Sequence, residues 1–103
     1  MINIKIDVEN MWVQIVGHAE SAPKGEDMVC AAVSTLAYTL AYNLQLMLDQ
    51  SEYTIHMEEG DAAIAALPNG YQAEQCREIF RIIGNGLCML AGQYDQYIHF
   101  EGN

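Results

Sequence analysis

A long uncharged segment, residues 28–48, limits the folds that are open to this chain. It is long enough to cross a bilayer as a helix, for which about 20 predominantly apolar residues suffice. Its apolar residues recur at spacings of three and four, however, which is typical of one buried face of a helix, and many of the remaining side chains are polar. The segment therefore predicts a buried helix of a globular protein and no membrane span. The apolar face consists of Val29, Val33, Leu36, Leu40, Leu44 and Met47.

The start of this helix is indicated by Asp27, whose carboxylate can accept hydrogen bonds from the N–H groups of the first turn. We expect the helix to end near Asp49. A second helix is predicted around Phe80, and it includes Gly84 and Gly86, which cost about 1 kcal/mol each relative to alanine and so predict close packing against a neighbour. Its apolar face consists of Cys76, Phe80, Ile83, Leu87 and Leu90.

Short segments on either side of the two helices alternate apolar and polar residues or are rich in apolar ones, which indicates strands. Tight turns join the first two strands and the next two, so we expect two antiparallel hairpins. The predicted order is β-β-α-β-β-α-β, an α+β fold with a single mostly antiparallel sheet and two long helices packed on it, in one domain over residues 1–103. The predicted strands are residues 2–8, 11–16, 53–57, 61–67 and 94–100.

The charge of the chain excludes some functions. It has 14 acidic residues against 4 basic ones, a formal charge of −10, and its lysines and arginines are scattered. Nucleic-acid binding needs clustered cations, so no nucleic acid is expected, whereas a cationic protein would be attracted. Three cysteines cannot form a closed disulfide framework, and no signal peptide is visible, so we expect a cytoplasmic protein.

Two residues could carry nucleophilic chemistry. Cys30 is the third residue after Asp27 and so lies in the first helical turn, where N–H groups and the helix dipole favour a thiolate. We expect these N–H groups, including that of Cys30, to stabilise an oxyanion. His18 ends the second predicted strand, and one loop returns the chain from it to the helix. A cysteine and a histidine within hydrogen-bond reach are the minimal unit of thiol-based acyl transfer. On spacing alone, a core role for Cys30 and a surface role for His18 remain open.

The other cysteines and histidines have simpler interpretations. We expect Cys76 and Cys88 to be small core residues, and His56 and His99 to be surface positions on strands. The chain has no C-x-x-C pair, so a zinc site is not favoured. A redox sensor would need a resolving cysteine near Cys30. The acidic residues Glu58, Glu59 and Asp61 are expected at a solvated hairpin tip.

Two motifs resemble the signature of the ribosomal-processing cysteine proteases, the Prp family. They are Gly17-His18-Ala19 and the sequence GEDMVCAAVS at residues 25–34, and the resemblance extends along nearly the whole chain. It implies that His18 and Cys30 form a catalytic dyad. It also implies supporting or substrate-binding roles for Asp27 and Ser34.

The resemblance further implies an activity and an assembly. Members of the family are small α/β dimers with a mobile loop between the histidine and the cysteine. They remove a short N-terminal extension from ribosomal large-subunit protein twenty-seven, or, in phages, process capsid or scaffold proteins. We therefore expect a homodimeric cysteine endopeptidase without a cofactor. The alternative is a non-catalytic protein-binding module of the same fold.

The segment at residues 19–25 joins the two proposed catalytic residues. Its side chains are small or polar and offer no apolar anchor to the core, so we expect it to open at low free-energy cost, with Gly25 as a hinge. Residues 20–24 and Met28 depart from the family pattern. The departure in residues 20–24 leaves the choice of substrate open.

Overall fold

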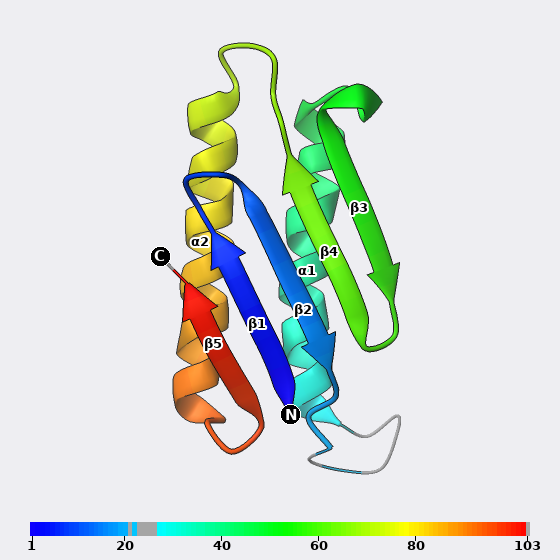
Figure 1. Cartoon of the computed structure of the whole chain (residues 1–103), viewed down its shortest axis with the longest axis vertical. Helices are drawn as coiled ribbons and strands as arrows, with labels where there is room; N and C mark the ends of the chain where they lie inside the picture. The colour runs from blue at the N-terminus through cyan, green and yellow to red at the C-terminus, as the bar shows by residue number, and fades with distance from the viewer. Residues whose placement is uncertain (21, 23–26, 103) are drawn as a thin grey trace.

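The computed structural model describes residues 1–20, 22 and 27–102, and its elements follow the predicted order (Figure 1). A short 3₁₀ helix, η1, is the one described element that the sequence pattern did not indicate. The elements are β1 (Ile2–Asp7), β2 (Trp12–Gly17), α1 (Met28–Met47), η1 (Gln50–Glu52), β3 (Tyr53–Glu58), β4 (Asp61–Ala66), α2 (Ala73–Gln93) and β5 (Ile98–Gly102).

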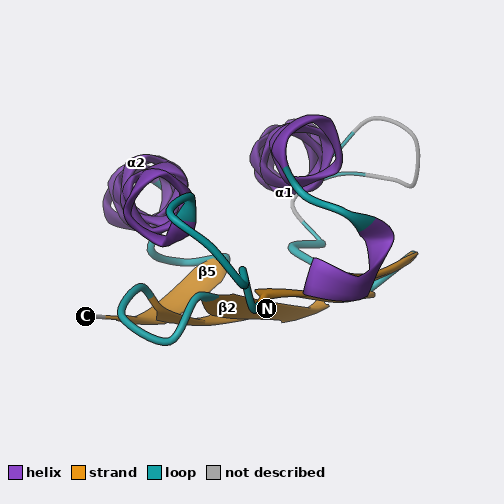
Figure 2. Cartoon of the chain, turned by 90° about the horizontal axis from the view of Figure 1, so that it is seen from above, coloured by secondary structure: helices purple, strands orange, loops and turns teal. Residues whose placement is uncertain are grey.

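The strands of the described chain form one sheet in the order β3-β4-β2-β1-β5. The two predicted hairpins pair antiparallel, and β2 also pairs antiparallel with β4. Only β5 runs parallel to its neighbour, β1, among these strands. Both long helices lie on the same face of the sheet (Figure 2). The predicted α+β fold with a mostly antiparallel sheet is therefore confirmed.

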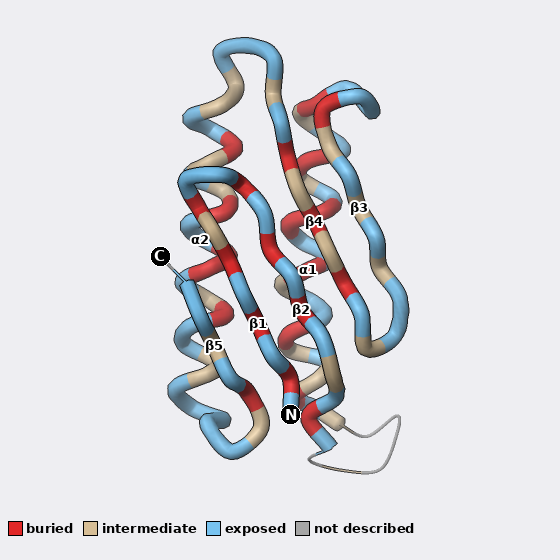
Figure 3. Tube along the Cα trace, in the orientation of Figure 1, coloured by how far each residue is buried: buried red, intermediate tan, exposed pale blue. Residues whose placement is uncertain are grey.

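The core lies between this face of the sheet and the helices (Figure 3). Along β1, Ile2, Ile4 and Ile6 are buried, whereas Asn3 and Lys5 are exposed, as the alternation predicts. The predicted apolar faces of the helices are also buried, except that Leu36, Met47 and Leu90 are only partly covered. The buried helical residues are Val29, Val33, Ala37, Leu40, Ala41 and Leu44 of α1 and Cys76, Phe80, Ile83, Gly84 and Leu87 of α2. None of the described helices is long and apolar enough to cross a membrane.

The glycines inside α2 allow two close approaches. A Cβ atom at Gly84 would lie 3.0 Å from Cδ1 of Ile6, on the sheet, and one at Gly86 would lie 3.1 Å from Cδ1 of Leu36, on α1. Both distances are shorter than ordinary van der Waals contact. The predicted close packing of these glycines is confirmed, and both neighbours, Ile6 and Leu36, belong to the same chain.

The start of β5 differs from the prediction. Residues 94–97 alternate like a strand, but they form a turn that continues from α2, and β5 begins at Ile98. The N–H group of Tyr94 donates to the carbonyl of Leu90, and the N–H groups of Tyr97 and Ile98 donate to the carbonyl of Tyr94. Local helical hydrogen bonding therefore outweighs the alternating pattern here.

A buried carboxylate fixes the connection after α1, which ends at Met47 with Leu48 as its C-cap, close to the predicted end near Asp49. The side chain of Glu52 accepts from the N–H groups of Asp49 at 3.0 Å and Asn69 at 2.6 Å. These bonds, first that from Asn69, lower the pKa of Glu52, because they favour the ionised carboxylate. Glu52 thereby joins the end of α1 to the segment before α2.

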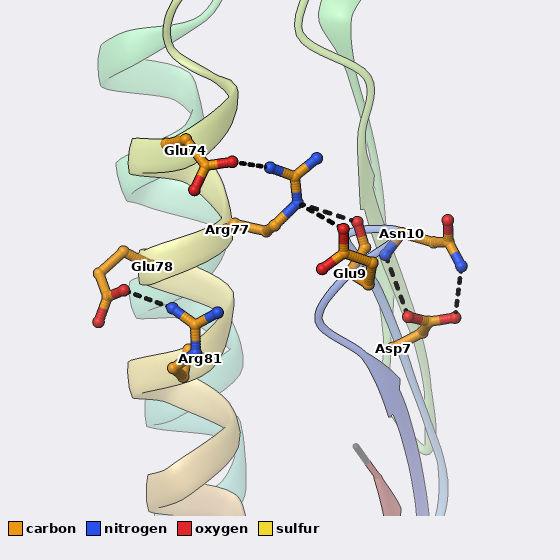
Figure 4. Close-up of polar contacts among 7 residues, drawn as sticks. All are labelled: Asp7, Glu9, Asn10, Glu74, Arg77, Glu78 and Arg81. Atoms are coloured by element: carbon orange, nitrogen blue, oxygen red, sulfur yellow. Dashed lines mark hydrogen bonds and ion pairs between the residues drawn. The ribbon is translucent and has the colours of Figure 1, made fainter.

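Two cationic side chains, Arg77 and Arg81, lie on α2 and pair with acidic side chains of the same helix (Figure 4). Arg81 pairs with Glu78, and Arg77 pairs with Glu74. Nε of Arg77 also donates to the carbonyl oxygen of Glu9 in the β1–β2 turn, at 3.1 Å. Arg77 therefore links α2 to the β1–β2 turn, whereas Arg81 pairs within α2.

Candidate active site

The end of β2 and the start of α1 lie at the same end of the molecule (Figure 1). β2 ends at Gly17, so His18 is the first residue beyond the strand, and α1 begins at Met28. The N–H group of Gly17 donates to the carbonyl of Gly60, in the β3–β4 turn, at 2.9 Å. Three separate parts of the chain therefore meet here: the end of β2, the first turn of α1 and the β3–β4 turn.

Cys30 lies in the first turn of α1 and is half-buried. Asp27 is the N-cap, as predicted, and its Oδ1 accepts from the N–H group of Cys30 at 3.0 Å. The expectation that this N–H group binds an oxyanion is therefore wrong, because it is already used in the cap. The sulfur of Cys30 accepts a hydrogen bond from the N–H group of Ala19 at 3.3 Å, which links the first turn of α1 to the chain just after β2.

His18 is exposed, and its backbone and side chain are held by different neighbours. Its carbonyl accepts from the N-terminal ammonium group of Met1 at 2.6 Å. Its imidazole lies against Gly60, where a Cβ atom added to the glycine would be 2.5 Å from Nε2. The ring thus lies against the β3–β4 turn.

His18 and Cys30 line one cavity of about 710 Å³. Ligand sites in proteins usually enclose about 300–1,000 Å³, so this cavity has the size of a binding site. Within the described part of the chain, no hydrogen bond joins the imidazole of His18 to the sulfur of Cys30. Catalytic hydrogen bonds are often long or absent before substrate binds, so this arrangement is compatible with a dyad that closes on the substrate.

The remaining predicted site residues are placed as follows. Asp27 and Ser34 line the same cavity as His18 and Cys30, with Ser34 one turn after the cysteine on α1. Gly25 and most of the segment at residues 19–25 lie outside the described residues, so the predicted hinge and opening of that segment remain predictions.

The cavity is acidic. Its described lining includes the carboxylates of Glu20, Asp27, Glu58, Glu59 and Asp61 and no lysine or arginine. The acidic residues of the β3–β4 turn are exposed at a hairpin tip, as predicted, but they also form one wall of the site. A cavity with this lining favours a cationic ligand over an anionic one.

Sequence reasoning missed the β3–β4 turn as part of the site. No sequence motif marks this turn. The turn lies near His18 because β2 pairs with β4. It also missed a second groove, between α1 and the edge strand β3, which continues from the cavity through Tyr38 and Met57. The sequence shows Gly60 in a two-residue hairpin loop, but it does not show that the ring of His18 lies against this glycine.

The cysteines outside the site divide into two kinds. Cys76 is fully buried, with its sulfur 3.9 Å from that of Met47. Burial, and then the charge of Glu52, raise the pKa of the Cys76 thiol. Cys88 is exposed on α2, so the expectation that it belongs to the core is wrong. Neither lines the cavity around Cys30, so the described residues offer no resolving cysteine for a redox sensor.

The other two histidines are on the surface, as predicted. Nε2 of His56 lies 3.5 Å from Asp61, and Nε2 of His99 lies 3.2 Å from Glu101. No group of three or more histidine, cysteine, aspartate or glutamate side chains within the described residues could hold a metal ion. Polar contacts with surface carboxylates account for both histidines.

The chain is similar to known proteins in sequence and in fold. The family model for cysteine protease Prp matches residues 1–99. The fold is similar to that of the essential ribosomal processing protease Prp from S. aureus in complex with a covalently linked product peptide, with a TM-score of 0.82, 21% identity and complete coverage of both chains. The same S. aureus protease in complex with a substrate peptide gives a TM-score of 0.77 at 20% identity, again with both chains fully covered.

A third solved structure, SMU.848 from Streptococcus mutans, has a TM-score of 0.71 at 24% identity and covers 98% of this chain and 90% of its own. No curated protein matches the chain in sequence. At these identities the structures show that the fold is shared.

Proposed function

Because the chain belongs to the cysteine protease Prp family, we propose that it hydrolyses peptide bonds with Cys30 as nucleophile and His18 as general base. The observation that carries this proposal is that both side chains line one cavity, although they come from different elements. The bond from the Ala19 N–H group to the sulfur of Cys30 supports it, since it ties the backbone next to His18 to the nucleophile.

The proposed reaction has two steps. His18 takes the proton of the Cys30 thiol, the sulfur attacks the scissile carbonyl carbon, and the protonated imidazole gives its proton to the leaving amine as the C–N bond breaks. In the second step His18 takes a proton from water as the oxygen attacks the thioester carbon, the C–S bond breaks to release the acid product, and the protonated imidazole returns its proton to the sulfur of Cys30. The covalently linked product peptide of the S. aureus relative supports a covalent route.

Two further residues have supporting roles in this proposal. Asp27 caps α1 at the N–H group of Cys30 and so fixes the first turn that carries the nucleophile. Ser34 lies one turn further along the same cavity, where its hydroxyl is available to the substrate backbone. In this proposal the oxyanion is bound by donors other than the N–H group of Cys30, because that group donates to Asp27.

We infer that the substrate is the N-terminal extension of a ribosomal protein, namely large-subunit protein twenty-seven, or a phage structural protein. The S. aureus relative is a ribosomal processing protease with a substrate peptide, and the acidic lining of the present cavity favours a basic protein. The groove that continues past Tyr38 and Met57 offers room for an extended peptide. Such a substrate is made in the cytoplasm, where thiols stay reduced.

The test uses a fluorogenic peptide that spans the N-terminal extension of ribosomal protein twenty-seven from the host. Cys30→Ser should abolish cleavage with the fold intact, and His18→Ala should lower the acylation rate by about 10²–10⁴. Cys88→Ser is the matched control, because it removes an exposed thiol that lies outside the cavity. Full cleavage by the Cys30 variant would contradict the proposed nucleophile, whereas no cleavage by the wild-type protein would favour the protein-binding module.

A dependence on salt tests the substrate class separately. Screening weakens the attraction between an acidic cavity and a basic peptide. KM for the basic peptide should therefore rise between low and high salt, while KM for a variant peptide with its lysines replaced by glutamine should change little. Equal salt dependence for the two peptides would argue against recognition by the acidic lining.

We also propose that the chain forms a homodimer through the outer face of α1. Met28 and Leu46 lie on this face and are 82% and 68% exposed. The open face of the sheet exposes less, since Trp12 and Val16 are 37% and 40% exposed. Large apolar side chains gathered on one face are typical of an interface.

Light scattering tests this assembly. The wild-type protein should have about twice the monomer mass of 11.5 kDa at micromolar concentration. Leu46→Lys should shift it toward the monomer, whereas Ile82→Lys, at a similarly exposed residue of α2, should not. A monomeric wild-type protein would contradict the proposal.

A further inference from the structure

Gly60 occupies the second position of the two-residue turn between β3 and β4. Its φ is +75°, and the flanking residues Glu58 and Asp61 are paired in the sheet. Positive φ is easy for glycine and tolerable for asparagine, but it is strained for most other residues. The turn alone therefore asks for glycine or asparagine at this position.

The surroundings of Gly60 are more demanding than the turn. A Cβ atom there would lie 2.5 Å from Nε2 of His18, 2.9 Å from Cε1 and 3.3 Å from Cδ2. The two shorter distances are well inside van der Waals contact, so any side chain at position 60 must displace the imidazole or the turn. The missing side chain of Gly60 leaves the space in which the ring lies.

The backbone of Gly60 is also bonded to the chain next to His18. Its carbonyl accepts from the N–H group of Gly17, the residue before His18, at 2.9 Å. The turn and the end of β2 are therefore linked directly by this hydrogen bond. Ala19, the residue after His18, donates to the sulfur of Cys30, so the residues on the two sides of His18 are bonded to the turn and to the nucleophile.

We propose that Gly60 is a positioning residue for His18: its backbone and its missing side chain fix where the imidazole lies relative to Cys30. This inference rests on the proposed role of His18 as general base. It makes the β3–β4 turn a part of the enzyme that supports the base. A displaced base lowers the rate of acylation, and a displacement of about 1 Å can cost on the order of 10²-fold.

The first experiment measures whether the ring moves. The chain has three histidines, so the imidazole signals in a ¹H–¹³C NMR spectrum of the full-length protein are few enough to assign. Gly60→Ala should shift the signals of His18 and leave those of His99 unchanged. Unchanged His18 signals in both Gly60→Ala and Gly60→Asn would overturn the proposal.

The second experiment measures whether the movement acts through His18. Gly60→Ala and Gly60→Asn should lower kcat for the fluorogenic peptide, and the alkylation rate of Cys30 by iodoacetamide, by about tenfold or more, with KM within about twofold. Gly60→Asn keeps a residue that tolerates the turn, so it separates the contact with the ring from the strain of the turn. Gly92→Ala is the control, because no heavy atom lies within 4 Å of the added Cβ there, and its rates should equal those of the wild type.

A double-mutant cycle separates this inference from the function on which it rests. In a His18→Ala background, Gly60→Ala should have no further effect on the alkylation rate of Cys30, because the group that it displaces is gone. The same loss in both backgrounds would overturn the positioning role. If His18→Ala alone cleaves peptide and alkylates at the wild-type rate, the proposed base is wrong, and that outcome is distinct from a failure of Gly60 alone.

Discussion

Replacing Asp27 by alanine removes the acceptor that caps α1. The N–H group of Cys30 then loses a hydrogen bond of 3.0 Å at the start of the helix. Loss of an aspartate N-cap costs about 1 kcal/mol, within a range of about 0.5–2 kcal/mol. In a domain of about 100 residues, 1 kcal/mol lowers Tm by roughly 4–8 °C. Asp27→Asn keeps an acceptor oxygen and should cost no more than about 0.5 kcal/mol.

The assay is thermal unfolding followed by circular dichroism at pH 7. All variants are compared at one protein concentration, because dimerisation would make Tm depend on concentration. The order expected for Tm is wild type, then Asp27→Asn, then Asp27→Ala. If Asp27→Ala melts with the wild type, or if Asp27→Asn loses as much as Asp27→Ala, the hydrogen bond does not stabilise the helix as reasoned.

Three further predictions concern the core and the connection after α1. The lowered pKa of Glu52 means that its charge stabilises the fold at pH values above its unfolded pKa of about 4.3 and that this contribution is lost as pH falls through the folded pKa. Glu52→Gln should therefore lower Tm at pH 7 but much less at pH 3, and an equal loss at both would contradict this. Phe80→Ala should cost about 3–5 kcal/mol in urea unfolding, since Phe80 is fully buried; a loss below about 1 kcal/mol would mean that the core collapses around the gap. Cys76→Ala should cost about 1–3 kcal/mol and Cys88→Ala less than about 0.5 kcal/mol, while iodoacetamide should label Cys88 and not Cys76 in the folded protein; equal labelling would contradict the burial of Cys76.

The candidate catalytic residues came from the sequence by two routes of unequal strength. Spacing after Asp27 placed Cys30 in the first helical turn, and the structure confirms that position and the cap. Spacing alone did not select His18 over a surface histidine, and it was the motif resemblance that assigned the pair. The structure places both residues on one cavity, while the dyad itself remains a proposal.

Local sequence patterns were enough to predict the order of the elements, the two hairpins, the cap at Asp27 and most of the buried helix faces. These features depend on contacts between residues that are close in the chain, and periodicity records such contacts directly. The tertiary structure decided what depends on residues far apart in the chain. The pairing of β2 with β4 brings Gly60 against the ring of His18, and the packing of α2 leaves Cys88 exposed. An alternating pattern indicates which side of a strand is apolar. It does not indicate which distant turn lies next to the end of that strand, because this depends on how the strands pair in the sheet.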